Sequence, residues 1–144
     1  MGTPTTLQEV YDSFFAKTDE DFFGKEALVF NWLNSSISKC KKYVKNPLDY
    51  ILDTPIAPAI VSYDGSFTVT LDNDEIELIA LQMKYEYYDR KNAYLTALRR
   101  EVGTKDFNVL PNKKQELDGM QNSMRLLKED IKELQQQFNT YKYS

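Results

Sequence analysis

The clearest pattern in the chain is an apolar stripe near its C-terminal end. Between Leu117 and Tyr141 the apolar positions follow one another in alternating steps of three and four residues, and almost all positions between them are polar. This spacing places the apolar side chains along one face of a helix. The stripe consists of Leu117, Met120, Met124, Leu127, Ile131, Leu134, Phe138 and Tyr141.

The stripe predicts a C-terminal helix over about residues 111 to 141, roughly 45 Å long at about 1.5 Å per residue. We expect Pro111 at its first position, where the missing N–H costs no hydrogen bond. The half from Leu117 to Leu127 is expected to pack on the protein's own body, against the third helix. Two alternatives stay open for the half from Ile131 onwards. It packs on the same body, or it extends from that body and meets another chain.

Two of the three preceding helices begin with a capping box, in which two side chains satisfy each other's free backbone amides. Thr6 and Glu9 form the first box, and the helix that follows is expected to end near Lys17. Asp72 and Glu75 form the second box and open a long helix, which residue 103, a glycine, is expected to end. Apolar residues occupy two sides of this long helix, so we expect it to be central.

The remaining helix is predicted over about residues 24 to 44. Its apolar face would carry Phe30, Leu33, Ile37, Cys40 and Val44, with Trp32 lying off that face. Several lysines crowd its last turns, where cations complement the free carbonyl groups of a helix end. This local role explains the lysines better than a nucleic-acid patch does. The lysines are Lys39, Lys41, Lys42 and Lys45.

A β-hairpin insertion is predicted between the helices, over about residues 46 to 71. Three prolines interrupt its first part, and Asp64-Gly65 then has the composition of a two-residue hairpin turn. A single hairpin is marginal in water, so it must pack on helices or pair with another chain. The candidate contact tip is Tyr63, Asp64, Gly65 and Ser66.

Composition removes most catalytic chemistry. Histidine is absent, so the commonest general base and metal ligand is missing. The single Cys40 is expected to be a buried apolar residue, and neither a glycine-rich phosphate loop nor a zinc-binding cluster is present. We therefore expect no catalytic residue, no metal, no cofactor and no enzymatic activity. No apolar run is long enough to span a membrane, and no signal peptide is visible.

Charge is divided unevenly along the chain, whose net charge is −4. Residues 48 to 79 carry seven acidic side chains and no lysine or arginine. Such a face does not hold DNA phosphates, because it has no cations to replace their counterions. A DNA-binding protein is therefore a poor interpretation of the chain.

Four segments together resemble small structural proteins of tailed bacteriophages, of the head–tail connector or neck adaptor type. They are LQEVYDSFFAKTDEDF, WLNSSISKCKK, FTVTLDNDEIELIALQMKYEYYDR and KDFNVLPNKKQELDGMQNSMRLLKEDIKELQQQFNTYKY. Their order matches over nearly the whole chain. The segment PLDYILDTPIAPAIVSYDGS is longer than in the shorter members of this group, and it is a candidate contact arm.

The resemblance implies a mainly α protein of a single domain, residues 1–144, in which a long central helix, a long C-terminal helix and one hairpin form a small bundle. It implies a homo-oligomeric ring of about twelve copies below the portal protein, in the neck of the virion. Such a ring extends the channel for genomic DNA without sequence-specific binding, and it contacts other neck and tail proteins. The chain would be made in the host bacterial cytoplasm.

The candidate interface with the portal or a neighbouring subunit is the end of the C-terminal helix. Exposed aromatic side chains concentrate binding energy, and this segment is rich in them. The candidate residues are Leu134, Phe138, Tyr141 and Tyr143. A different class of function stays open beside this one: a small coiled-coil interaction or scaffold protein that forms a dimer through the same helix.

Overall fold

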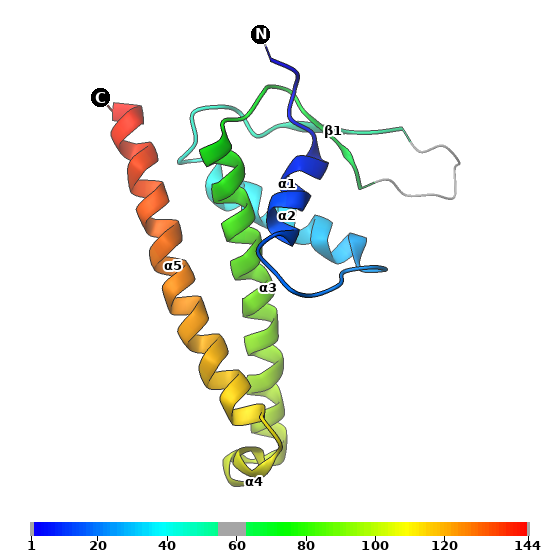
Figure 1. Ribbon diagram of the computed structural model, residues 1–144, viewed down its shortest axis with the longest axis vertical. Coiled ribbons are helices and arrows are strands. Elements are labelled where there is room, and N and C mark those ends of the chain that lie inside the picture. The colour runs from blue at the N-terminus through cyan, green and yellow to red at the C-terminus, as the bar shows by residue number, and fades with distance from the viewer. Residues whose placement is uncertain (1, 55–62, 144) are drawn as a thin grey trace.

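The computed structural model describes residues 2–54 and 63–143, with side chains described up to Phe138. Within these ranges the chain is mainly helical, as the sequence predicts, with five helices and one small antiparallel sheet (Figure 1). The elements in order are α1 (Leu7–Phe15), α2 (Glu26–Cys40), β1 (Tyr50–Leu52), β2 (Gly65–Phe67), α3 (Asn73–Val102), α4 (Thr104–Val109) and α5 (Lys113–Tyr143).

Helix α1 begins where its capping box predicts. The Thr6 hydroxyl accepts a hydrogen bond from the Glu9 amide at 3.2 Å, and the Glu9 carboxylate accepts one from the Thr6 amide at 2.8 Å. The helix ends at Phe15, two residues before the expected end. Its buried face seats the helix against α3 and consists of Leu7, Val10, Tyr11 and Phe14.

Helix α3 is the centre of the fold. Its capping box at Asp72 and Glu75 is confirmed, and it ends at Gly103, whose φ of 87° few other residues adopt readily. The helix contacts α1, α2, α4 and α5. Figure 1 shows α5 along one side of α3, α1 beside the other side of its first half, and α2 crossing behind it. A helix covered on two sides needs two apolar faces, which explains its double pattern.

The stripe of α5 packs on the protein's own body. Leu117, Leu127, Ile131 and Phe138 are buried, and the residues between them on the stripe are half-buried. Helices α3 and α5 have 30 and 31 residues and run antiparallel, so α5 stays beside α3 along its length (Figure 1). Up to Phe138, α5 therefore packs on the same body. For this part of the helix, the alternative in which it extends away from the body is wrong.

The connection between α3 and α5 differs from the prediction. Residues 104–109, expected to be a link, form the short helix α4, because Phe107 is almost fully buried in a small cluster with Leu95 and Leu117. Helix α5 begins at Lys113 and not at Pro111. Asn112, with a φ of 62°, turns the chain, and its carbonyl accepts a hydrogen bond from the Glu116 amide at 2.9 Å.

The aromatic core also corrects the predicted face of α2. Trp32 is buried, although the spacing placed it off the apolar face. Its ring lies within 6.0 Å of the rings of Phe14, Phe22 and Tyr87, measured between centroids. Helix α2 packs along α3, and Trp32 also contacts Phe14 of α1, so more of its circumference is buried than a single stripe. Phe30 and Ile37 remain half-buried at the edge.

The small sheet pairs different residues from those predicted. Strand β1 pairs with β2 so that Leu52 faces Gly65 and Tyr50 faces Phe67. Asp64-Gly65 is therefore not the turn, and the chain just before Tyr63 lies outside the described residues. The second edge of β2 is bonded to the N-terminal segment, where the Phe67 amide donates to the Thr5 carbonyl at 2.8 Å. Phe67 is buried, so the sheet packs on the helices.

We predict that Gly65→Ala destabilises the protein by about 1–3 kcal/mol. A Cβ atom at Gly65 would lie 2.3 Å from the carbonyl oxygen of Ile51 and 2.8 Å from the Cα atom of Leu52, so the strand backbones must separate. Denaturant unfolding measures the change. Gly119→Ala is the matched control: a Cβ atom there meets no atom within 4 Å, and helix propensity favours alanine by up to about 1 kcal/mol. Equal stabilities of the two variants would contradict the prediction.

Candidate functional site

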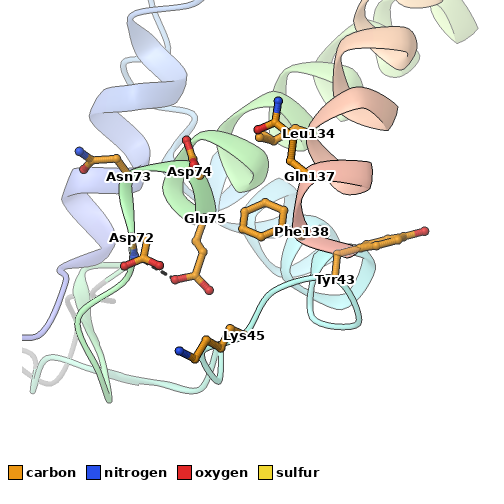
Figure 2. A pocket seen from close by; sticks show the side chains of 9 residues that line it. All are labelled: Tyr43, Lys45, Asp72, Asn73, Asp74, Glu75, Leu134, Gln137 and Phe138. Carbon is orange, nitrogen blue, oxygen red and sulfur yellow. Dashed lines mark hydrogen bonds between the residues drawn. The ribbon is translucent and has the colours of Figure 1, made fainter. Parts of the chain in front are cut away.

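A cleft of about 740 Å³ lies where the last turns of α5 meet the first turn of α3 (Figure 2). It contains two of the four residues expected at the interface, Leu134 and Phe138. The chain after α2 closes a third side. The lining residues are Tyr43, Lys45, Asp72, Asn73, Asp74, Glu75, Leu134, Gln137 and Phe138.

Glu75 connects the segments that form the base of this cleft. Its side chain is fully buried, and its carboxylate accepts three hydrogen bonds. The Asp72 amide donates at 2.9 Å, the Asn46 amide at 3.1 Å and the Asn46 side-chain amide at 2.6 Å. The capping residue therefore also ties the chain after α2 to the start of α3, a role that the local sequence pattern could not reveal.

The cleft has one apolar wall and an acidic rim. Phe138 and Leu134 form the wall, while Asp72 and Asp74 at the rim are exposed, with Lys45 opposite them (Figure 2). The start of α3 is already capped by its own carboxylates, so it does not attract a further anion. This arrangement suits an apolar or basic segment of another polypeptide. No pair of nucleophile and base lies among the residues that line it.

The four expected interface residues lie in different environments. Phe138 is buried and Leu134 is half-buried against the core, so neither is an exposed anchor of the isolated chain. The side chains of Tyr141 and Tyr143 lie outside the described residues, although their backbone continues α5. Their proposed contacts with the portal or a neighbour stay a prediction.

The candidate hairpin tip is not a tip. Gly65 and Ser66 belong to strand β2, and the connection between the strands runs through residues 53–64, most of which lie outside the described residues. The Tyr63 carbonyl accepts a hydrogen bond from the Tyr11 hydroxyl at 2.7 Å, and the Tyr63 ring lies 5.3 Å from that of Phe30. Burial, followed by the nearby Asp64 carboxylate, raises the pKa of Tyr11. These contacts anchor the start of β2 on the helices.

Two more clefts flank Tyr94 on α3, and the sequence analysis did not identify them. Tyr94 is 64% exposed and lines both clefts together with Lys91. Lys91 forms an ion pair with Glu20 at 2.5 Å, and its ammonium group lies 5.3 Å from the centre of the Tyr87 ring. The sequence indicates these clefts in one way: Tyr94 continues an apolar stripe of α3 past the part of that helix that α1 and α2 cover.

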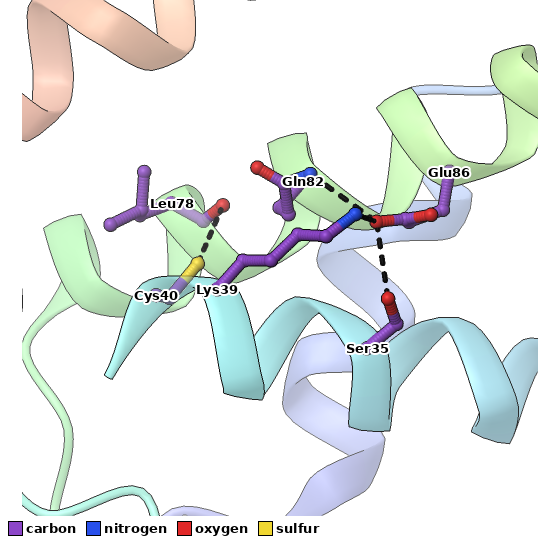
Figure 3. Close-up of polar contacts among 6 residues, drawn as sticks. All are labelled: Ser35, Lys39, Cys40, Leu78, Gln82 and Glu86. Carbon is purple, nitrogen blue, oxygen red and sulfur yellow. Dashed lines mark hydrogen bonds and ion pairs between the residues drawn. The ribbon is translucent and has the colours of Figure 1, made fainter. Parts of the chain in front are cut away.

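A polar network joins α2 to α3 on the inner side (Figure 3). The Glu86 carboxylate accepts hydrogen bonds from Lys39, from Ser35 at 3.2 Å and from Gln82 at 3.4 Å. Cys40 lies beside this network and is fully buried, as expected. Burial raises the pKa of its thiol to about 12, so Cys40 is protonated and unreactive at neutral pH.

The described part of the chain offers no metal centre: no group of three or more histidine, cysteine or acidic side chains is placed to hold an ion. None of the helices in this part has both the length and the apolarity to cross a membrane. Comparisons with protein-family models, with curated proteins and with solved structures found no match. The case for a function therefore rests on the sequence pattern and on the surfaces described above.

We predict that Glu75→Ala destabilises the protein by about 2–3 kcal/mol, because three part-buried hydrogen bonds to a buried carboxylate are lost. Glu75→Gln keeps one acceptor oxygen and should cost less. Urea unfolding of both variants measures the order. Glu77→Ala is the control, because Glu77 is a partly exposed neighbour with a single ion pair to Lys17. A loss at Glu75 no larger than at Glu77 would show that the buried network contributes little.

We predict that Glu20→Gln lowers the melting temperature between about pH 5 and 9, and that this difference from the unmodified chain shrinks in acid. The hydrogen bond from Lys91 holds the pKa of Glu20 below its usual 4.5, so its contribution is present above that pH and is lost as the pH falls through the folded-state pKa. The same bond raises the pKa of Lys91, so a loss at the alkaline end begins only above its usual 10.5.

Melting curves across this pH range test the Glu20 prediction. Asp19→Asn is the matched control, since Asp19 is an exposed neighbour with no ion pair among the described residues. A pH-independent effect of Glu20→Gln would mean that packing, and not charge, links this loop to α3.

Proposed function

We propose that this chain is a structural subunit of a bacteriophage neck, which forms a ring below the portal, extends the DNA channel and connects head to tail. The observation that carries the proposal is the order of four phage-like segments along nearly the whole sequence. The fold is compatible with it, because the mainly α protomer that the resemblance implies is the one described here. The proposed role involves no catalysis and no cofactor.

The two ends of the molecule differ, which supports a connector that contacts one partner at each end. Figure 1 shows both termini and the sheet at one end of the molecule, and α4 at the other. The first end holds the cleft of Leu134 and Phe138 and, shortly after them along α5, Tyr141 and Tyr143. We assign this end to the portal and the α4 end, where Val109 is 76% exposed, to the next component of the neck.

The acidic segment supports a role beside DNA that does not bind it. The described part of residues 48–79 keeps its carboxylates largely on the surface and offers no cation. Those carboxylates of the segment that no subunit or portal contact covers would face the channel, repel phosphates and let DNA slide. The DNA would therefore pass without sequence-specific contacts.

The second candidate, a dimeric coiled-coil scaffold, is disfavoured by the packing of α5. A coiled coil would use the stripe that includes Leu117, Leu127 and Ile131, and these side chains are already buried against the protein's own helices. Freeing them would uncover the main contact of α3. The remaining faces of α5 are mostly polar and exposed.

We predict that the purified chain co-sediments with portal rings of its own phage in a fixed ratio, and that removal of residues 139–144 weakens this binding. The cut is placed after Phe138 because a cut after Leu134 would remove a core side chain. If Tyr141 and Tyr143 are anchors worth about 2 kcal/mol each, binding falls by at least tenfold for either single alanine variant.

Val109→Ser is the matched control, since it removes an exposed apolar side chain at the α4 end. It should leave portal binding unchanged. Absence of co-sedimentation by the full chain would overturn the neck proposal. Normal binding by the shortened chain would support the neck proposal but show that the portal contact does not lie at the C-terminal end.

A further inference from the structure

One face of α3 carries an exposed aromatic ring among cations. Tyr94 stands between two clefts, and Arg90 lies one turn before it, so both point to the same side. Arg90 has no ion pair within the described ranges. Lys25 and Lys91 line the same cleft, where Glu20 pairs with Lys91 and leaves Arg90 and Lys25 as the cations in excess. We call Lys25, Arg90, Lys91, Tyr94 and the adjoining Gly119 the Tyr94 patch.

Gly119 gives this patch an unfilled space. It lies inside helix α5, where glycine costs up to about 1 kcal/mol relative to alanine. A Cβ atom there would meet nothing within 4 Å, so no contact inside the chain requires glycine. Gly119 and Tyr94 line one cleft of about 500 Å³. Glycine at position 119 therefore leaves a space beside Tyr94 that a side chain of another molecule can occupy.

Strand β1 carries a surface of opposite charge, on which an exposed apolar side chain lies between two carboxylates. Ile51 is 72% exposed, and Asp49 and Asp53, two residues before and after it, extend to the same side of the strand. Neither carboxylate forms an ion pair within the described part of the chain. β1 is the outer strand, because β2 lies between it and the N-terminal segment. We call Asp49, Ile51 and Asp53 the β1 face.

We propose that the β1 face of one copy docks on the Tyr94 patch of a second copy of this chain. Ile51 would enter the space between Tyr94 and Gly119, and Asp49 and Asp53 would meet the cations of the patch. An exposed apolar side chain between two like charges favours a partner that offers an apolar space between opposite charges. This inference rests on the proposed function in one respect, because it identifies the lateral contact of the ring.

The positions of the two surfaces make the contact head-to-tail. The sheet lies beside the start of α3 (Figure 1), whereas Tyr94 lies roughly 30 Å further along that helix at about 1.5 Å per residue. One molecule therefore cannot satisfy its own β1 face. A contact between two different surfaces leaves one of each free at the ends, so it repeats until it closes into a ring or continues as a filament.

Cross-linking of engineered cysteines tests the orientation. Ile51→Cys chains are mixed with Tyr94→Cys chains and treated with a short bismaleimide. The native Cys40 is buried and does not interfere. We expect a covalent dimer that contains one chain of each kind, and a ladder of multimers from the double variant. Val109→Cys replaces Tyr94→Cys as the control, because it is an equally exposed apolar position outside the patch.

A charge swap tests the recognition. Arg90→Glu in the Tyr94→Cys chain should slow its cross-linking to the Ile51→Cys chain by about fivefold, and Asp49→Arg with Asp53→Arg in the Ile51→Cys chain should restore it. Arg100→Glu is the matched control, an exposed arginine of the same helix with no ion pair in the described residues. Circular dichroism verifies that each variant folds.

Preferential cross-linking of residue 51 to residue 94, together with rescue by the swap, supports the proposal. Cross-linking no faster than with the Val109 control overturns it, as do dimers formed by Ile51→Cys chains alone, which indicate a symmetric contact. Portal co-sedimentation is measured separately. Cross-linking without portal binding would support the lateral contact and contradict the proposed function in the neck. Portal binding without cross-linking would support that function and contradict the lateral contact.

Discussion

The contact between α3 and α5 is the interaction on which the rest of the structure depends. Two helices of almost equal length lie antiparallel, and the stripe of α5 covers one of the two apolar sides of α3. The other side is then free for α1 and α2, which bring the aromatic core around Trp32 and Tyr87. Without α5, α3 would expose a continuous apolar face.

Two carboxylates, Glu75, which is fully buried, and Glu86, which is half-buried, connect the other elements to this pair. Glu75 bonds the chain after α2 to the start of α3, and Glu86 bonds α2 to the middle of α3. A buried carboxylate is costly unless it is fully hydrogen-bonded, so each one admits a single arrangement of its donors. These two residues therefore fix how α2 lies across α3. That placement determines the shape of the clefts beside Phe138 and Tyr94.

The proposed contacts depend on the apolar side chains that this packing leaves exposed. The apolar groups that remain exposed are dispersed single side chains, such as Ile51, Tyr94 and Val109, on different elements. Single exposed apolar residues are common in monomers. Their arrangement here is informative because Ile51 lies between carboxylates and Tyr94 beside cations, so each has a charge pattern that complements the other.

The sequence by itself determined the starts of α1 and α3 and the end of α3, because each depends on bonds within about four residues, as at Thr6, Asp72 and Gly103. It also predicted the stripe of α5 and the packing of its first half on α3, but not that the second half would pack there too. The tertiary structure alone decided that Leu52 pairs with Gly65, that Trp32 is buried and that Tyr94 is exposed. These outcomes depend on residues far apart in the chain, and local periodicity contains no information about which distant face will supply the contact.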